Sequence, residues 1–169
     1  MPRTISLNLR NALYAQNTNE VPVVLIKLWA TDVPGTVIRI STDPTTLIST
    51  APQIYGTLSG GAWHYFYPIM VQLPDIIDER APTAKLAIEN VSRDMVSFVR
   101  NMAAPGKCDI KVVLAATPNT IEIDYPDFDI LSSQYNESIL SIEVGLNALD
   151  QEPFPAGLFT PAGFPGLFG

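Results

Sequence analysis

Charge and cysteine are both scarce in this sequence. Only 16% of the 169 residues are charged, well below the quarter or so that is usual in soluble domains. The single cysteine, Cys108, excludes an intrachain disulfide and a cysteine-based zinc or iron–sulfur site. Folding is therefore expected to depend on packing alone. Much of the surface must be neutral, which suits burial against partners.

Basic clusters and long apolar runs are missing as well. Ten Lys and Arg residues face 17 Asp and Glu residues, which gives a formal net charge of −7, and no basic run is able to neutralise several phosphates together. This balance argues against specific nucleic-acid binding. Polar residues interrupt every long apolar stretch, and no apolar leader follows Met1. We therefore expect a soluble chain, made in the cytoplasm, without membrane insertion.

Candidate catalytic groups are few and isolated. His64 is the only histidine and lies within an aromatic segment, which favours a partly buried core or interface side chain over a catalyst. Cys108 begins an apolar segment after Lys107 and is interpreted as a small core residue. The chain has no Gly-rich phosphate loop, no nucleophile elbow and no HExxH motif. We expect no enzymatic activity and no cofactor.

Acidic residues gather at two places. Glu122, Asp124, Asp127 and Asp129 straddle a predicted turn, where calcium would find oxygen ligands, but their spacing matches no calcium loop. A solvated strand face without metal is the prediction for them. Asp75, Asp78 and Glu79, beside Arg80, are predicted to lie in an exposed loop.

Apolar periodicity predicts a mostly β chain with two short helices. One helix is expected within 6–17, with Ser6 as its cap, and another begins at Ser92 and ends before Pro105. A turn at Pro126 and Asp127 is expected to separate two strands. Pro68 is expected to produce a bulge, an edge or a break within 63–73. The predicted strands are 21–29, 37–41, 48–55, 63–73, 84–91, 108–115, 120–125, 128–135 and 138–144.

The chain is expected to consist of two parts, a β-rich domain over 1–150 and an extended C-terminal arm over 151–169. The arm carries no charge after Glu152, and four prolines exclude regular helix and sheet, which leaves an extended or polyproline-like path. Its apolar side chains are the predicted interface residues: Phe154, Leu158, Phe159, Phe164, Leu167 and Phe168. Such a segment marks an interaction surface. The arm packs either along its own domain or across a neighbouring subunit.

A second surface hypothesis concerns the aromatic segment. Trp63, Tyr65 and Tyr67 alternate along one predicted strand and therefore share a face. They would form a stacking platform for sugar rings, or else belong to the core or pack on a neighbouring strand.

Several segments together resemble a family of phage and prophage tail proteins. They are the run 86–91 before a short helix, the segments 112–115 and 118–122, and above all 152–155 with the closing Phe-Pro-Gly-Leu-Phe of 164–168. The similarity covers about residues 5–168. These proteins look related to the minor tail protein L group of lambda-like siphophages.

That resemblance implies a β-barrel or sandwich-like hub domain in the virion, at the tail tip of a bacteriophage. It further implies a homo-oligomeric ring, trimeric or hexameric, that contacts distal tail, hub or tape measure proteins. The lambda L group also carries a cysteine-rich iron–sulfur region, which Cys108 alone cannot supply. No redox role is therefore transferred, and the expected function is that of a structural adaptor.

Overall fold

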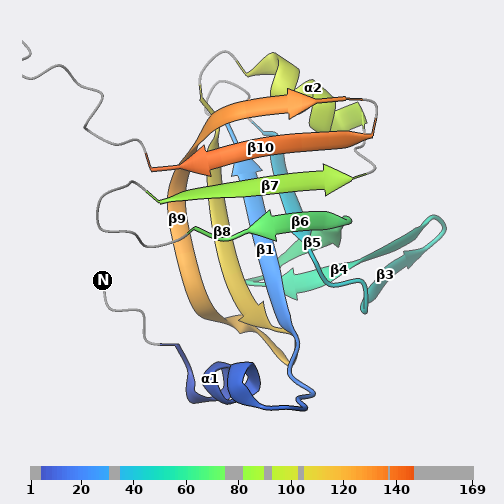
Figure 1. Ribbon diagram of the computed structural model, residues 1–169. Coiled ribbons are helices and arrows are strands. Elements are labelled where there is room, and N and C mark those ends of the chain that lie inside the picture. Colours follow the sequence, from blue (N-terminus) through green and yellow to red (C-terminus); the bar gives the residue numbers. More distant parts are fainter. Residues whose placement is uncertain are drawn as a thin grey trace, which may run out of the picture.

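The computed structural model describes residues 5–30, 35–74, 82–89, 93–102, 105–136 and 138–146. Within these ranges the chain is mostly β with two short helices, as the periodicity predicted (Figure 1). The elements are α1 (Leu7–Tyr14), β1 (Pro22–Trp29), β2 (Val37–Ser41), β3 (Leu47–Thr50), β4 (Gln53–Ser59), β5 (Ala62–Phe66), β6 (Ile69–Gln72), β7 (Thr83–Glu89), α2 (Arg93–Asn101), β8 (Lys107–Leu114), β9 (Thr117–Tyr135) and β10 (Ile139–Gly145).

The ten described strands join into one sheet in the order β3-β4-β5-β2-β1-β8-β9-β10-β7-β6. The described pairs are antiparallel except for β2 with β5, which run parallel over a short stretch. β1 and β2 form an antiparallel hairpin, and β8, β9 and β10 form an antiparallel meander. The first and last strands of this order, β3 and β6, are the sheet's edges.

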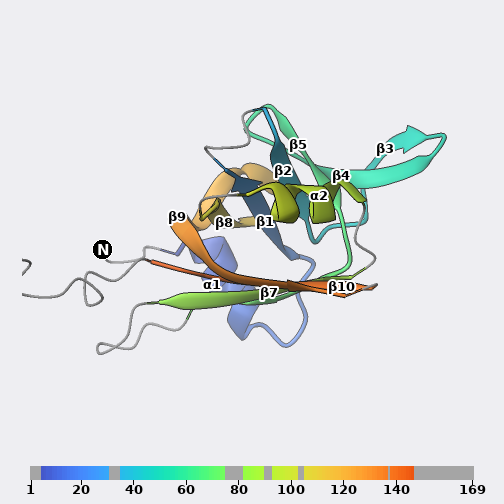
Figure 2. The same ribbon diagram turned by 90° about the horizontal axis from the view of Figure 1, so that it is seen from above.

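The sheet bends so far that it forms two layers. Figure 1 shows β9 curving from a course beside β8 to a course beside β10, and Figure 2 shows β7 and β10 in one layer with β1, β2 and β8 in the other. Three register shifts interrupt the β8–β9 pairing. Since bulges bend a strand and increase its twist, they allow one long strand to serve both layers.

The turn predicted at Pro126 and Asp127 is wrong. Both residues lie inside β9, where Asp127 has a φ of 58° and its N–H donates to Asp109 Oδ1 at 3.1 Å. Asp is one of the few residues that tolerates this left-handed backbone, so a turn-like dipeptide is accommodated as a bulge. The predicted pair of strands is therefore one bent strand.

Two other segments also differ from prediction. The single strand expected over 48–55 is a hairpin of β3 and β4, reversed at Ala51 and Pro52. The segment 63–73 breaks at Pro68, one of the three outcomes expected there, into β5 and β6. Tyr67 N–H donates to Ser41 in one layer, and the Pro68 carbonyl accepts from Glu89 in the other. Pro68 thus marks the corner at which the chain changes layers.

The core fills the space between the layers, and the helices lie at its two ends (Figure 1). α2 inserts the buried side chains of Met95 and Phe98 at one end. At the other end Leu9 of α1 is buried, and Ser6 caps that helix as predicted by accepting from Leu9 N–H at 3.2 Å. The predicted Ser92 cap lies outside the described residues. Of the described helices, neither has the length and apolar character needed to cross a bilayer.

Candidate functional site

The predicted arm interface lies outside the described residues, as do the boundary at residue 150 and the acidic group of Asp75, Asp78 and Glu79. The six arm residues concerned are Phe154, Leu158, Phe159, Phe164, Leu167 and Phe168. The site that the structure does describe is therefore built from the β domain.

The three aromatic residues singled out from the sequence line one groove. Trp63 and Tyr65 are 37% and 44% exposed, whereas Tyr67 is half-buried and packs against the core. The groove has a volume of about 440 Å³, which lies within the range of about 300–1,000 Å³ for small-molecule pockets. Its other lining residues are Val37, Ile38, Arg39, Ala62 and Met95. We call this surface the aromatic groove.

The aromatic groove exists because β2 and β5 diverge. Their parallel pairing covers only Ile40 with Tyr65 and Ser41 with Phe66, although both strands begin three residues earlier. The two separated strand starts form the walls. The alternation of aromatic residues in the sequence was sufficient to predict that they share one face. Val37, Arg39 and Met95 come from distant segments, and no local sequence pattern indicates that they line the groove.

Beside this groove, the other face of β5 carries His64 in a positive environment. Burial lowers the pKa of His64, and the charges of Arg39 on β2 and Lys111 on β8 lower it further, against hydrogen bonds to the backbone that raise it. Its Nδ1 is buried without a hydrogen-bond partner. The imidazole is therefore neutral at pH 7 and half-buried, in agreement with the interpretation as a core or interface histidine.

The pH dependence of stability tests this environment. The unfolded chain has a histidine pKa near 6.5, above that of folded His64, so at lower pH the unfolded state takes up the proton first. The free energy of unfolding should therefore fall below pH 6.5, until the folded pKa is also passed. His64→Gln should remove that part of the decrease when urea unfolding is compared at pH 7.5 and pH 5. Equal pH dependence in both proteins would contradict the assignment.

Cys108 is confirmed as a core residue. Its side chain is fully buried, and burial, followed by the charge of Asp109, raises the pKa of the thiol to about 12. The thiolate is the nucleophilic form, so this sulfur stays protonated and unreactive at neutral pH.

The acidic residues around the β9 bulge do not act together. Glu122 is buried rather than solvated, which corrects the prediction, and it accepts from Ser6 N–H at 3.0 Å and Ser6 Oγ at 2.8 Å. This carboxylate thereby fixes the start of α1 to β9. Asp129 pairs with Lys107 at 2.8 Å. Among the described residues, no group of three His, Cys, Asp or Glu side chains is placed to hold a metal ion.

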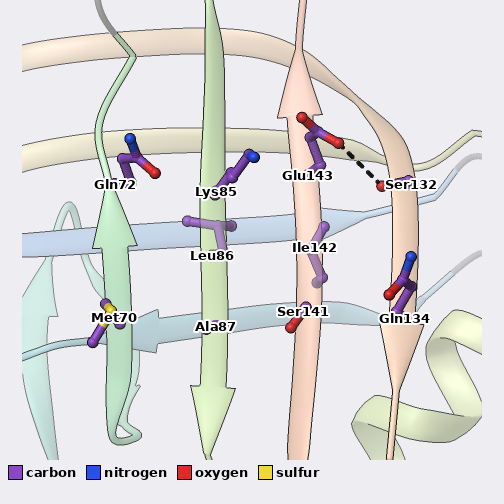
Figure 3. A pocket seen from close by; sticks show the side chains of 10 residues that line it. All are labelled: Met70, Gln72, Lys85, Leu86, Ala87, Ser132, Gln134, Ser141, Ile142 and Glu143. Atoms are coloured by element: carbon purple, nitrogen blue, oxygen red, sulfur yellow. Dashed lines mark hydrogen bonds between the residues drawn. The ribbon is translucent and has the colours of Figure 1, made fainter.

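A second hollow lies on the outer face of β6, β7, β10 and β9 (Figure 3). It measures about 340 Å³, and the small side chains of Ala87 and Ser141 lie between the longer ones of Met70 and Gln134. Lys85 lies opposite Glu143 in the β7–β10 register, and Glu143 accepts from Ser132 Oγ at 3.4 Å. This hollow differs from the aromatic groove because no aromatic side chain is among its lining residues.

Comparisons with known proteins find no match to this chain, either among protein-family models or among curated proteins.

Proposed function

We propose that this chain is a structural protein of the virion, a minor tail or hub adaptor in the tail tip of a siphophage. It is synthesised in the host cytoplasm and assembles as a trimeric or hexameric ring with distal tail, hub or tape measure proteins. Its mechanism is assembly and involves no catalysis. The place in a tail comes from the resemblance to phage tail proteins of segments 86–91, 112–115, 118–122, 152–155 and 164–168.

The proposal of assembly depends on one structural observation: large apolar side chains are exposed on the outer surface of α1. Leu7 is 73% exposed, Leu13 63% and Tyr14 86%, on a helix of eight residues whose inward side chain is Leu9. Single exposed apolar residues are ordinary, but a group on one short helix indicates a surface that a partner covers. Met70 on the edge strand β6 adds a further side chain, 76% exposed.

Incorporation into tails tests the proposal. A variant with Leu7, Leu13 and Tyr14 all changed to serine should stay folded, because these side chains are exposed and each surface change shifts stability by only about 0.5 kcal/mol. If partners bury them, each contributes about 1 kcal/mol or more, and incorporation should fall roughly tenfold or more. The measurement is the amount of the protein in purified tails after complementation of a phage that lacks it.

Two further variants complete the experiment. Asn8→Ser with Asn11→Ser changes two exposed polar residues of the same helix and should leave incorporation unchanged. A chain ending after Asp150 tests the arm, and its mass in solution is measured alongside. Normal incorporation of both the α1 variant and the shortened chain would rule out the proposed assembly surfaces.

A carbohydrate- or receptor-binding β module of a tail is the second candidate, and the aromatic groove favours it. Trp63 and Tyr65 are exposed in that groove beside Arg39, a combination that suits stacking on a sugar ring together with a polar contact. Glycan binding by the isolated protein that is lost in Trp63→Ala would favour this candidate over the adaptor.

A further inference from the structure

The aromatic groove is an open surface whose chemistry matches one segment of the same chain. Grooves lined by aromatic side chains are the usual receptors for extended, proline-rich segments, since such segments lose little conformational entropy on binding. The C-terminal arm is such a segment, with prolines at 153 and 155 on either side of Phe154. Its lack of charge after Glu152 also suits a groove formed mainly by aromatic and aliphatic side chains.

The end of β10 lies within reach of the groove. Residues in lateral register form a row across five strands: Gly145, Asp129, Lys107, Trp29 and Val37. Four steps of about 4.8 Å give about 19 Å along the sheet from Gly145 to Val37, which itself lines the groove. The eight residues 146–153 span about 25 Å at about 3.1 Å per residue. A chain of this length brings Phe154 to the groove without help from a second copy.

The charges of the groove and of the arm also favour binding of the arm in the aromatic groove. Arg39 lines the groove and takes part in neither of the salt bridges formed among the described residues. Glu152 is the last charged residue of the chain and directly precedes Pro153 and Phe154. The hollow of Figure 3 offers no equivalent, because its long side chains include both Lys85 and Glu143, which lie opposite each other.

We propose that the first part of the arm, residues 152–159, binds in the aromatic groove of its own chain, with Phe154 and Phe159 as anchors against Trp63 and Tyr65. The groove volume of about 440 Å³ accommodates part of the arm only. The distal residues Phe164 and Phe168 stay available for other contacts. The inference goes beyond the proposed function, because it concerns the isolated chain and holds whether or not that chain assembles into a tail.

Trp63 reports on the groove directly. The chain has two tryptophans, so a Trp29→Phe background leaves Trp63 as the only one. In this background three full-length proteins are compared: the intact arm, Phe154→Ser with Phe159→Ser, and the matched control Phe164→Ser with Phe168→Ser. The observables are the emission maximum of Trp63, its quenching by acrylamide, and binding of a synthetic peptide of residues 151–160, each at a concentration where sedimentation shows monomers.

The proximal variant should show red-shifted emission, stronger quenching and saturable binding of the peptide. The intact arm and the distal control should protect Trp63 and bind the peptide roughly tenfold more weakly or worse, because a short tether gives the attached arm an effective concentration near mM. Equal quenching in all three proteins, or equal peptide binding, overturns the proposal. Protection that disappears on dilution, together with a loss of mass, assigns the arm to a neighbouring copy and overturns it as well.

A charge reversal provides the second measurement. Arg39→Glu should expose Trp63 to acrylamide even with an intact arm, and adding Glu152→Lys in the same chain should restore protection. If Arg39→Glu exposes Trp63 and the addition of Glu152→Lys does not restore its protection, the pairing of Glu152 with Arg39 is contradicted. A negative result in these measurements would not affect the expected incorporation into tails, so the two proposals are tested separately.

Discussion

Replacing Phe128 with alanine is expected to lower the free energy of unfolding by about 3–5 kcal/mol, because the change leaves a cavity where both layers meet. Phe128 is the largest of the fully buried side chains among the described residues, and its ring lies 5.9 Å from that of Tyr125. It follows the left-handed residue Asp127 and lies opposite Cys108 in the ladder. Its side chain therefore fixes the bend of β9 as well as the core.

Urea unfolding followed by circular dichroism measures this loss. For a domain of this size each kcal/mol shifts the melting temperature by about 2–4 °C, so a decrease of roughly 6–20 °C is expected in parallel. Leu131→Ala is the matched control, since Leu131 is on the same strand but 51% exposed, and should change stability by only about 0.5 kcal/mol. Similar losses for the two variants would show that the bend does not depend on Phe128.

Local sequence patterns were sufficient to predict the elements in which the apolar side chains consistently face one side. β7 alternates buried Ala84, Leu86 and Ile88 with exposed or half-buried residues, and this period fixes both its type and its face. The cap of α1 was likewise predictable, because a serine before an apolar-periodic segment is a local signal. The partner of that cap was not predictable, since Glu122 lies 116 residues away.

The errors have a common physical origin in pairing between distant strands. Pro126 and Asp127 carry turn chemistry, yet β8 pairs with Tyr125 before them and with Phe128 after them, and this keeps β9 continuous through the bulge. The aromatic groove shows the same limit. Alternation indicated that Trp63, Tyr65 and Tyr67 share a face, but whether that face is buried depends on where β2 and β5 separate.

Gly56→Ala is expected to destabilise the protein by about 1–3 kcal/mol, although a glycine in an open strand position gains about 0.5–1 kcal/mol from the same change. A Cβ at Gly56 would lie 2.1 Å from the backbone oxygen of His64 and 2.9 Å from Cδ1 of Ile48. Backbone cannot move aside as a flexible side chain does, so β4 must shift relative to β5. The sign of the stability change alone therefore distinguishes close strand contact from an ordinary strand position.

The same substitution should also alter the aromatic groove. Gly56 lies opposite Tyr65 in the β4–β5 register, so a displaced β4 moves the strand that carries both Tyr65 and Trp63. Thermal unfolding should show a decrease of roughly 2–12 °C, and the emission of Trp63 in a Trp29→Phe background should change in the folded protein. Gln53→Ala, on the same strand and exposed, is the control that should alter neither the melting temperature by more than about 2 °C nor the emission of Trp63. A Gly56→Ala protein as stable as the parent would contradict this close contact between β4 and β5.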